Sequence, residues 1–153
     1  LLCLAARRGD RPSIKVLLAA GAAVDAADTE GQTPLIHASR QGSEPAVRAL
    51  LAARAAPNSV TRDGNTALHI AAVGNQVAVL RLLLKSGATL DTRNRRGLTA
   101  LMVASMAGHP AVVTVLLDSG ADPDLVNPDH RTAKDLAVAA NHQQVVTLLG
   151  KLQ

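Results

Sequence analysis

The chain of 153 residues contains no Phe, Tyr or Trp, and its single cysteine is Cys3. Without aromatic rings it has no cage for a methylated cation, no tyrosine nucleophile and no platform on which nucleic-acid bases stack. A single cysteine excludes an internal disulfide and a cysteine-rich zinc site, and nothing places the chain in an oxidising compartment. We therefore expect a core of Leu, Val, Ile and Ala, no cofactor, and a location in the cytoplasm, the nucleus or both.

Acidic residues are scarce in the middle of the chain. Sixteen Lys and Arg against twelve Asp and Glu give a formal net charge of +4. Residues 32–117 carry nine bases and three acids, whereas residues 118–153 carry three bases and five acids. Such a local positive field favours acidic partners and fast association, although it does not by itself indicate nucleic acid. A surface that is merely solvated and rich in arginine is the alternative.

One uncharged stretch, residues 97–117, is long enough to span a bilayer. Thr99, Ser105 and the His109-Pro110 pair interrupt its apolar character, and it aligns with other stretches of the chain that carry charges. The first eight residues have no basic region ahead of their apolar run, unlike a signal peptide. The sequence therefore predicts no membrane insertion.

Self-similarity with a period of 33 residues organises the whole chain. Glycine recurs at positions 31, 64 and 97, alanine at 38, 71, 104 and 137, and leucine at 17, 50, 83, 116 and 149. Within each unit, Thr33-Pro34 and its equivalents predict the start of a short helix, and Gly or Asn about two turns later predicts its end. A second helix follows, and an Asp- and Asn-rich turn leads to the next unit. A unit of 33 residues with two short helices cannot bury the apolar faces of both helices by itself, so the units must stack.

These motifs resemble the ankyrin repeat. The segments 64–72 and 33–35 are similar to the first half of its signature, and 82–88 and 116–122 to the second half. The resemblance implies an all-α repeat solenoid of helix–turn–helix units joined by β-hairpin-like turns. We expect a single domain over residues 1–153, with units near 1–30 (partial), 31–63, 64–96, 97–129 and 130–153. The first unit begins inside its first helix, which we take to indicate a piece of a longer protein.

Three features of the sequence differ from a regular repeat. The motif histidine occurs only at His69, where it is expected to support the turn through hydrogen bonds. Arg54 stands where the other units have Gly21, Gly87 and Gly120, which predicts left-handed strain. Lys134 replaces the repeated leucine, as fits a terminal unit that faces water.

Catalytic and metal-binding patterns are missing from the sequence. No two of the five histidines are spaced i,i+4 on one helix, and no HExxH, GxSxG or phosphate-cradling glycine motif occurs. Cys3 occupies the motif-histidine position, so we interpret it as a packing residue. We expect no enzymatic activity and no metal site.

The resemblance implies that a partner lies in the groove between the turn tips and the first helices. The groove and tip positions that match, and that we predict to bind the partner, are Arg7, Arg8, Arg40, Gln41, Arg62, Asn65, Val73, Arg95, Arg96, Leu98 and Met106. Arginine suits bidentate capture of carboxylate or phosphate, and methionine adapts to different side chains. These residues favour a protein interaction module for an acidic peptide or domain that supplies an apolar anchor.

Two other functions stay open at this point. Arg93, Arg95 and Arg96 could bind nucleic acid through counterion release. The missing stacking residues and the acidic tail count against this function. The segment could also serve as a spacer or regulatory part of a multidomain enzyme whose chemistry lies elsewhere.

Overall fold

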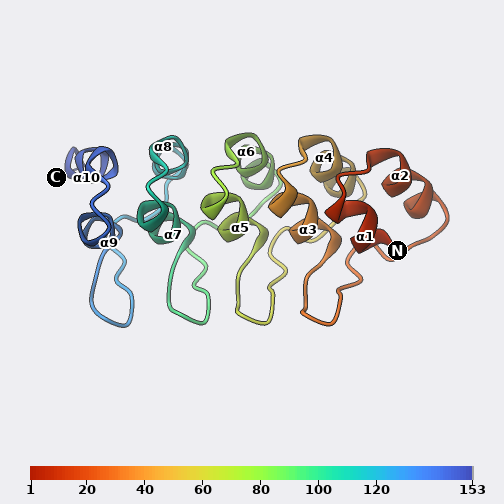
Figure 1. The fold of residues 1–153 in the computed structure, drawn as a ribbon, viewed down its shortest axis with the longest axis horizontal. Helices are drawn as coiled ribbons and strands as arrows, with labels where there is room; N and C mark the ends of the chain where they lie inside the picture. The colour runs from red at the N-terminus through yellow and green to blue at the C-terminus, as the bar shows by residue number, and fades with distance from the viewer. Residues whose placement is uncertain (153) are drawn as a thin grey trace.

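The repeat predicted from the sequence forms two parallel rows of helices in the computed structural model, which describes residues 1–152. The inner row consists of α1 (Leu2–Arg7), α3 (Pro34–Gln41), α5 (Ala67–Val73), α7 (Ala100–Ala107) and α9 (Ala133–Ala139). The outer row consists of α2 (Arg11–Ala19), α4 (Glu44–Ala52), α6 (Val77–Lys85), α8 (Pro110–Asp118) and α10 (Gln143–Gly150). Each helix packs against its partner in the pair and against the same helix of the neighbouring pair (Figure 1). The predicted all-α solenoid is confirmed, while Gln153, the end of the predicted domain, lies outside the described residues.

Long turns project from the side of the inner row in Figure 1. Residues 1–152 contain no β-strand, and one isolated antiparallel bridge joins Val60 to Thr66. The turns therefore resemble hairpins in their hydrogen bonding but do not form a sheet. No helix in this described range is both long enough and apolar enough to cross a bilayer.

Threonine begins four of the five inner helices, and a left-handed glycine ends two of them. The hydroxyl oxygens of Thr33, Thr66, Thr99 and Thr132 each accept a hydrogen bond from the backbone N–H three residues later. Gly42 and Gly108, with φ of 70° and 73°, end α3 and α7 in the left-handed conformation that a side chain disfavours. Each inner helix is therefore limited to about two turns, so the chain reverses into the outer helix at the same point in every unit.

An aliphatic ladder forms the core, in place of the missing aromatic rings. The repeated leucines of the outer helices, Leu50, Leu83 and Leu116, are fully buried, as are the repeated alanines of the inner helices. The small alanine side chains allow neighbouring inner helices to approach closely, and the leucines fill the space between the two rows. The core is thus continuous from one unit to the next.

Arg54 carries the strain that the sequence predicts. Its φ is 65°, whereas the equivalent Gly21, Gly87 and Gly120 have φ of 85°, 90° and 95°. A Cβ added at any of these three glycines would meet no atom within 4 Å, so the cost at Arg54 comes from its own backbone and not from a clash with neighbours.

Replacing Arg54 by glycine is expected to stabilise the protein by about 0.5–1 kcal/mol, since relief of the left-handed strain exceeds the entropy that glycine adds to the unfolded chain. The melting temperature should rise by roughly 2–4 °C per kcal/mol for a domain of this size. Thermal unfolding of the wild type, Arg54→Gly and the charge-preserving control Arg54→Lys checks this. A lower melting temperature for Arg54→Gly would show instead that the arginine side chain stabilises the fold.

Candidate functional site

Four turns of identical construction face the same side of the molecule, and we call residues 28–32, 61–65, 94–98 and 127–131 tips 1 to 4. In each tip the N–H of the first residue donates to the carbonyl of the fifth over 3.0 Å. A side-chain oxygen of that first residue (Asp28, Thr61, Asn94 or Asn127) accepts from the N–H of the fifth at 2.9–3.2 Å. The paired bonds close each tip from both directions, so the side chains at its apex project from a fixed backbone.

Neighbouring tips are also bonded to one another. The N–H of Arg62 in tip 2 donates to Glu30 in tip 1 over 3.3 Å, and the N–H of Arg95 in tip 3 donates to Asp63 in tip 2 over 2.9 Å. The equivalent residue of tip 4 is Pro128, which has no N–H to donate. At this joint the Arg93 guanidinium donates to the carbonyl of Val126 instead.

His69 ties the base of tip 3 to α5. Its Nδ1 lies 3.3 Å from the Thr66 nitrogen and 2.9 Å from the Thr66 hydroxyl, and its Nε2 lies 2.9 Å from the Leu98 carbonyl oxygen. Because that carbonyl can only accept, Nε2 carries the proton and Nδ1 accepts from the Thr66 N–H, so the ring is neutral. Burial lowers the pKa of His69, which agrees with the neutral form. The expected supporting role of this histidine is confirmed.

A recess of about 310 Å³ opens between tips 2 and 3 above α5 and α7. Five of the predicted site residues line it together: Asn65, Val73, Arg95, Arg96 and Leu98. Ile70 and Val103 add aliphatic surface, and Asp63, Asn94 and His69 complete the lining. The recess therefore combines an aliphatic base with a polar rim.

The rim of the recess is rich in hydrogen-bond donors. Arg95 and Arg96 are exposed, and within residues 1–152 neither side chain makes a hydrogen bond or ion pair. The side-chain oxygen of Asn65 accepts from the Asn94 amide over 2.9 Å, so the Asn65 amide nitrogen keeps its own donors. Asp63 is the single carboxylate of the lining. A ligand rich in acceptors, such as a carboxylate, is the chemical match for this rim.

Two of the apolar residues predicted for the groove differ in burial. Val73 is 52% exposed and its side chain is available, but Leu98 is only 4% exposed because the tip folds its side chain inward. Leu98 therefore contributes to the base of the recess. The sequence had placed it at an exposed tip, and this placement is wrong. Met106 is half-buried and lies outside the recess, and its carbonyl accepts from His142 over 2.9 Å.

The other predicted arginines are dispersed. Arg62 forms an exposed ion pair of 3.3 Å with Glu30, and Arg40 and Gln41 are exposed at the end of α3. Arg7 is exposed at the end of α1. None of these side chains lines the recess.

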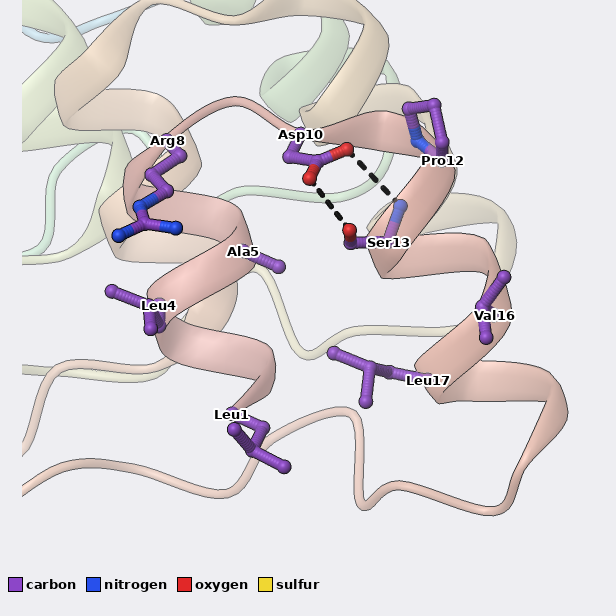
Figure 2. Close-up of a pocket in the computed structure, with 9 residues that line it drawn as sticks. All are labelled: Leu1, Leu4, Ala5, Arg8, Asp10, Pro12, Ser13, Val16 and Leu17. Atoms are coloured by element: carbon purple, nitrogen blue, oxygen red, sulfur yellow. Dashed lines mark hydrogen bonds between the residues drawn. The ribbon is translucent and has the colours of Figure 1, made fainter.

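Arg8 lines a different cavity, of about 390 Å³, at the N-terminal end of the stack (Figure 2). Leu4 of α1, Val16 and Leu17 of α2, and Leu1, which precedes α1, also line it. Asp10 accepts from the Ser13 N–H over 3.1 Å and from its hydroxyl over 2.6 Å, so it serves as the cap of α2. The positions equivalent to Leu1 and Leu17 are buried in every later unit, so this cavity exposes a surface that is covered elsewhere in the chain.

Asp63, Asn94, Ile70 and Val103 line the recess but were not among the predicted residues. Ile70 and Val103 occupy the same position in successive units, on the inner helices one residue after the motif position. The aliphatic residue at this repeat position was the sequence feature that could have predicted both residues, since both line the recess. Asp63 and Asn94 belong to the turn series and carried no separate signal.

Neither metal-binding nor nucleophilic chemistry finds support in the described part of the chain. No group of three or more His, Cys, Asp or Glu side chains is close enough to hold a metal ion in residues 1–152. Cys3 is half-buried and its thiol donates to the Ala26 carbonyl, and burial together with Asp28 raises its pKa. An activated cysteine shows the opposite shift.

A family model described as ankyrin repeats (3 copies) matches residues 2–94 and again residues 89–152. A search of the curated proteins found no match.

Proposed function

Because the chain belongs to the ankyrin-repeat family, whose members are generally non-catalytic protein interaction modules, we propose that it binds an acidic segment of another protein in the recess between tips 2 and 3. One observation carries the proposal: two arginines without intramolecular partners stand beside an aliphatic base in one cavity. Arginine binds carboxylates through paired N–H donors, and the aliphatic base offers an apolar contact.

The size of the recess limits what enters it. About 310 Å³ is at the lower end of the range for small-molecule sites. One or two side chains of a polypeptide fill such a volume, and the remaining chain would then lie along the tips. Since the recess has no aromatic side chain, any aromatic hot spot of the interface belongs to the partner.

Nucleic-acid binding through the arginine cluster has less support. Arg93 donates to the carbonyl oxygens of Val126 and Gly97, so its guanidinium is already engaged. The aliphatic base of the recess offers nothing to a phosphate backbone, and the chain has no aromatic side chain on which bases could stack. Cytoplasm and nucleus remain the proposed compartments.

Affinity purification with the tagged chain tests the recess. Charge reversal in Arg95→Glu is expected to lower recovery of acidic partners about tenfold or more, because one contact is lost and a repulsion is added. Arg54→Glu changes the net charge equally at an exposed position away from the recess, so it should retain recovery. Arg40→Glu reports whether the interface extends to α3. Unchanged recovery with Arg95→Glu would refute the assignment of the recess.

A further inference from the structure

A third cavity lies on the outer row of helices, between α2 and α4, and we call it the outer groove. Its volume is about 530 Å³. The charged side chains Arg11, Lys15, Glu44 and Arg48 line it together with the apolar Pro45 and Ala49. It is separate from the recess, because all of its residues come from the outer helices or their first turns.

The same groove recurs three repeats later, between α8 and α10. That matching groove has a volume of about 510 Å³, and its lining residues Pro110, Thr114, Gln143, Thr147 and Leu148 are equivalent to Arg11, Lys15, Glu44, Arg48 and Ala49. No charged side chain lines it. The shape of the outer groove is therefore a property of the fold, whereas its charge is particular to the first units.

Solvation does not account for the charge of the outer groove. Thr114 and Thr147 are exposed in the matching groove although no cation lines it, and their hydroxyls donate to carbonyls of their own helices over 2.9 Å. Helices α2, α4 and α6 together contain five cations and one carboxylate, whereas α8 and α10 contain one carboxylate and no cation. The positive charge within these helices is thus confined to the first three of the outer row.

Most of these cations lack an intramolecular counterion. Arg48 pairs with Glu44 on the surface of α4, a pair that contributes little because both side chains are exposed. Arg11, Lys15 and Arg81 make no side-chain hydrogen bond or ion pair among residues 1–152. Lys15, Arg48 and Arg81 occupy the same exposed position in the successive outer helices α2, α4 and α6, and they form a row across them.

We propose that the outer groove is a second docking surface, which binds an acidic polypeptide segment of a partner protein. The unpaired cations complement carboxylates, and the apolar surface of Pro45 and Ala49 suits the small apolar side chains of such a segment. A phosphate polymer would gain nothing from that apolar surface. Polypeptide is therefore the occupant that the groove fits.

Fluorescence anisotropy with a labelled peptide of about 16 residues that alternates Glu with Ala and Leu, long enough to extend past either helix, tests the proposal. Lys15→Gln with Arg48→Gln is expected to weaken binding about tenfold at low salt. Thr114→Glu with Thr147→Glu is the matched control, because it changes the net charge by the same amount at the equivalent positions of the matching groove. That control should retain wild-type affinity.

Each alternative has its own result. Equal weakening in the two double variants would overturn the proposal in favour of a non-specific field, and so would absence of peptide binding to the wild type. Tighter binding of a generic DNA duplex or of phosphatidylserine vesicles, lost in Lys15→Gln with Arg48→Gln, would overturn it in favour of a polyanion. The same titrations are repeated in an Arg95→Glu background, where the recess no longer binds an acidic peptide, so the signal reports the outer groove alone. Failure of the recess and failure of the outer groove are then distinguishable.

Discussion

Lysine at position 101 is expected to destabilise the protein by about 4 kcal/mol, the largest effect we predict for a single substitution. Leu101 is 1% exposed and belongs to the inner-helix position that holds Leu35 and Leu68 in the preceding units. In Leu101→Lys an ammonium group would be enclosed by the neighbouring units with no carboxylate to pair with it. At the equivalent position of the last unit, Lys134 is only half-buried because no described unit follows it.

Urea unfolding at two pH values distinguishes a buried charge from a simple packing defect. Burial lowers the pKa of a lysine below about 10.4, so the unfolded chain binds more protons between the two pKa values. The stability of Leu101→Lys should therefore rise with pH relative to the control Leu101→Met, which conserves volume. A cost below about 1 kcal/mol at neutral pH would contradict the prediction, since it would mean that the ammonium reaches water.

His69→Ala should lower the free energy of unfolding by about 3 kcal/mol, because it removes hydrogen bonds to Thr66 and Leu98 and leaves a cavity. The side chain is 2% exposed. Met102, which is fully buried at the equivalent position, shows that the fold accommodates methionine there. His69→Met should therefore cost only about 1–2 kcal/mol, the share of the hydrogen bonds alone.

Acidification provides an independent measurement of the same residue. The pKa of His69 is lowered in the folded protein, so the unfolded chain binds more protons between the folded value and about 6.5. Stability should fall as the pH decreases from about 6.5, and His69→Met should lose this part of the dependence. An identical pH profile for the wild type and His69→Met would show that the ring does not stay neutral in the folded state.

The fold was predictable because its determinants are local and repeat. Thr66 caps a helix and Gly108 ends one through interactions within a few residues, and the period of 33 then dictates how units stack. Arg54 was identified in the same way, since one unit departs from a glycine that the others share. The all-α class was predictable too, and residues 1–152 contain no strand because each tip is closed by bonds between its first and fifth residues that do not continue into a ladder.

The candidate site was predictable only in part. Arg93, Arg95 and Arg96 are the same residue type within four positions, yet Arg93 bonds to a neighbouring tip while the other two stay without partners. Leu98 lies at a tip in the sequence but turns inward. Such differences depend on the path of the backbone between two units, and composition or spacing does not contain that information.

Arg93 also determines how the last two tips are held together. Tips 1 to 3 are joined through backbone N–H groups, which no substitution other than proline removes. Tip 4 has Pro128 at that point, and the hydrogen bond across this joint comes from the guanidinium of Arg93, just before tip 3, to the carbonyl of Val126, just before tip 4. The hydrogen bonds between neighbouring tips are therefore main-chain bonds from tip 1 to tip 3, whereas the bond at the fourth tip comes from a side chain. Substitution of Arg93 therefore removes this hydrogen bond without altering any core residue.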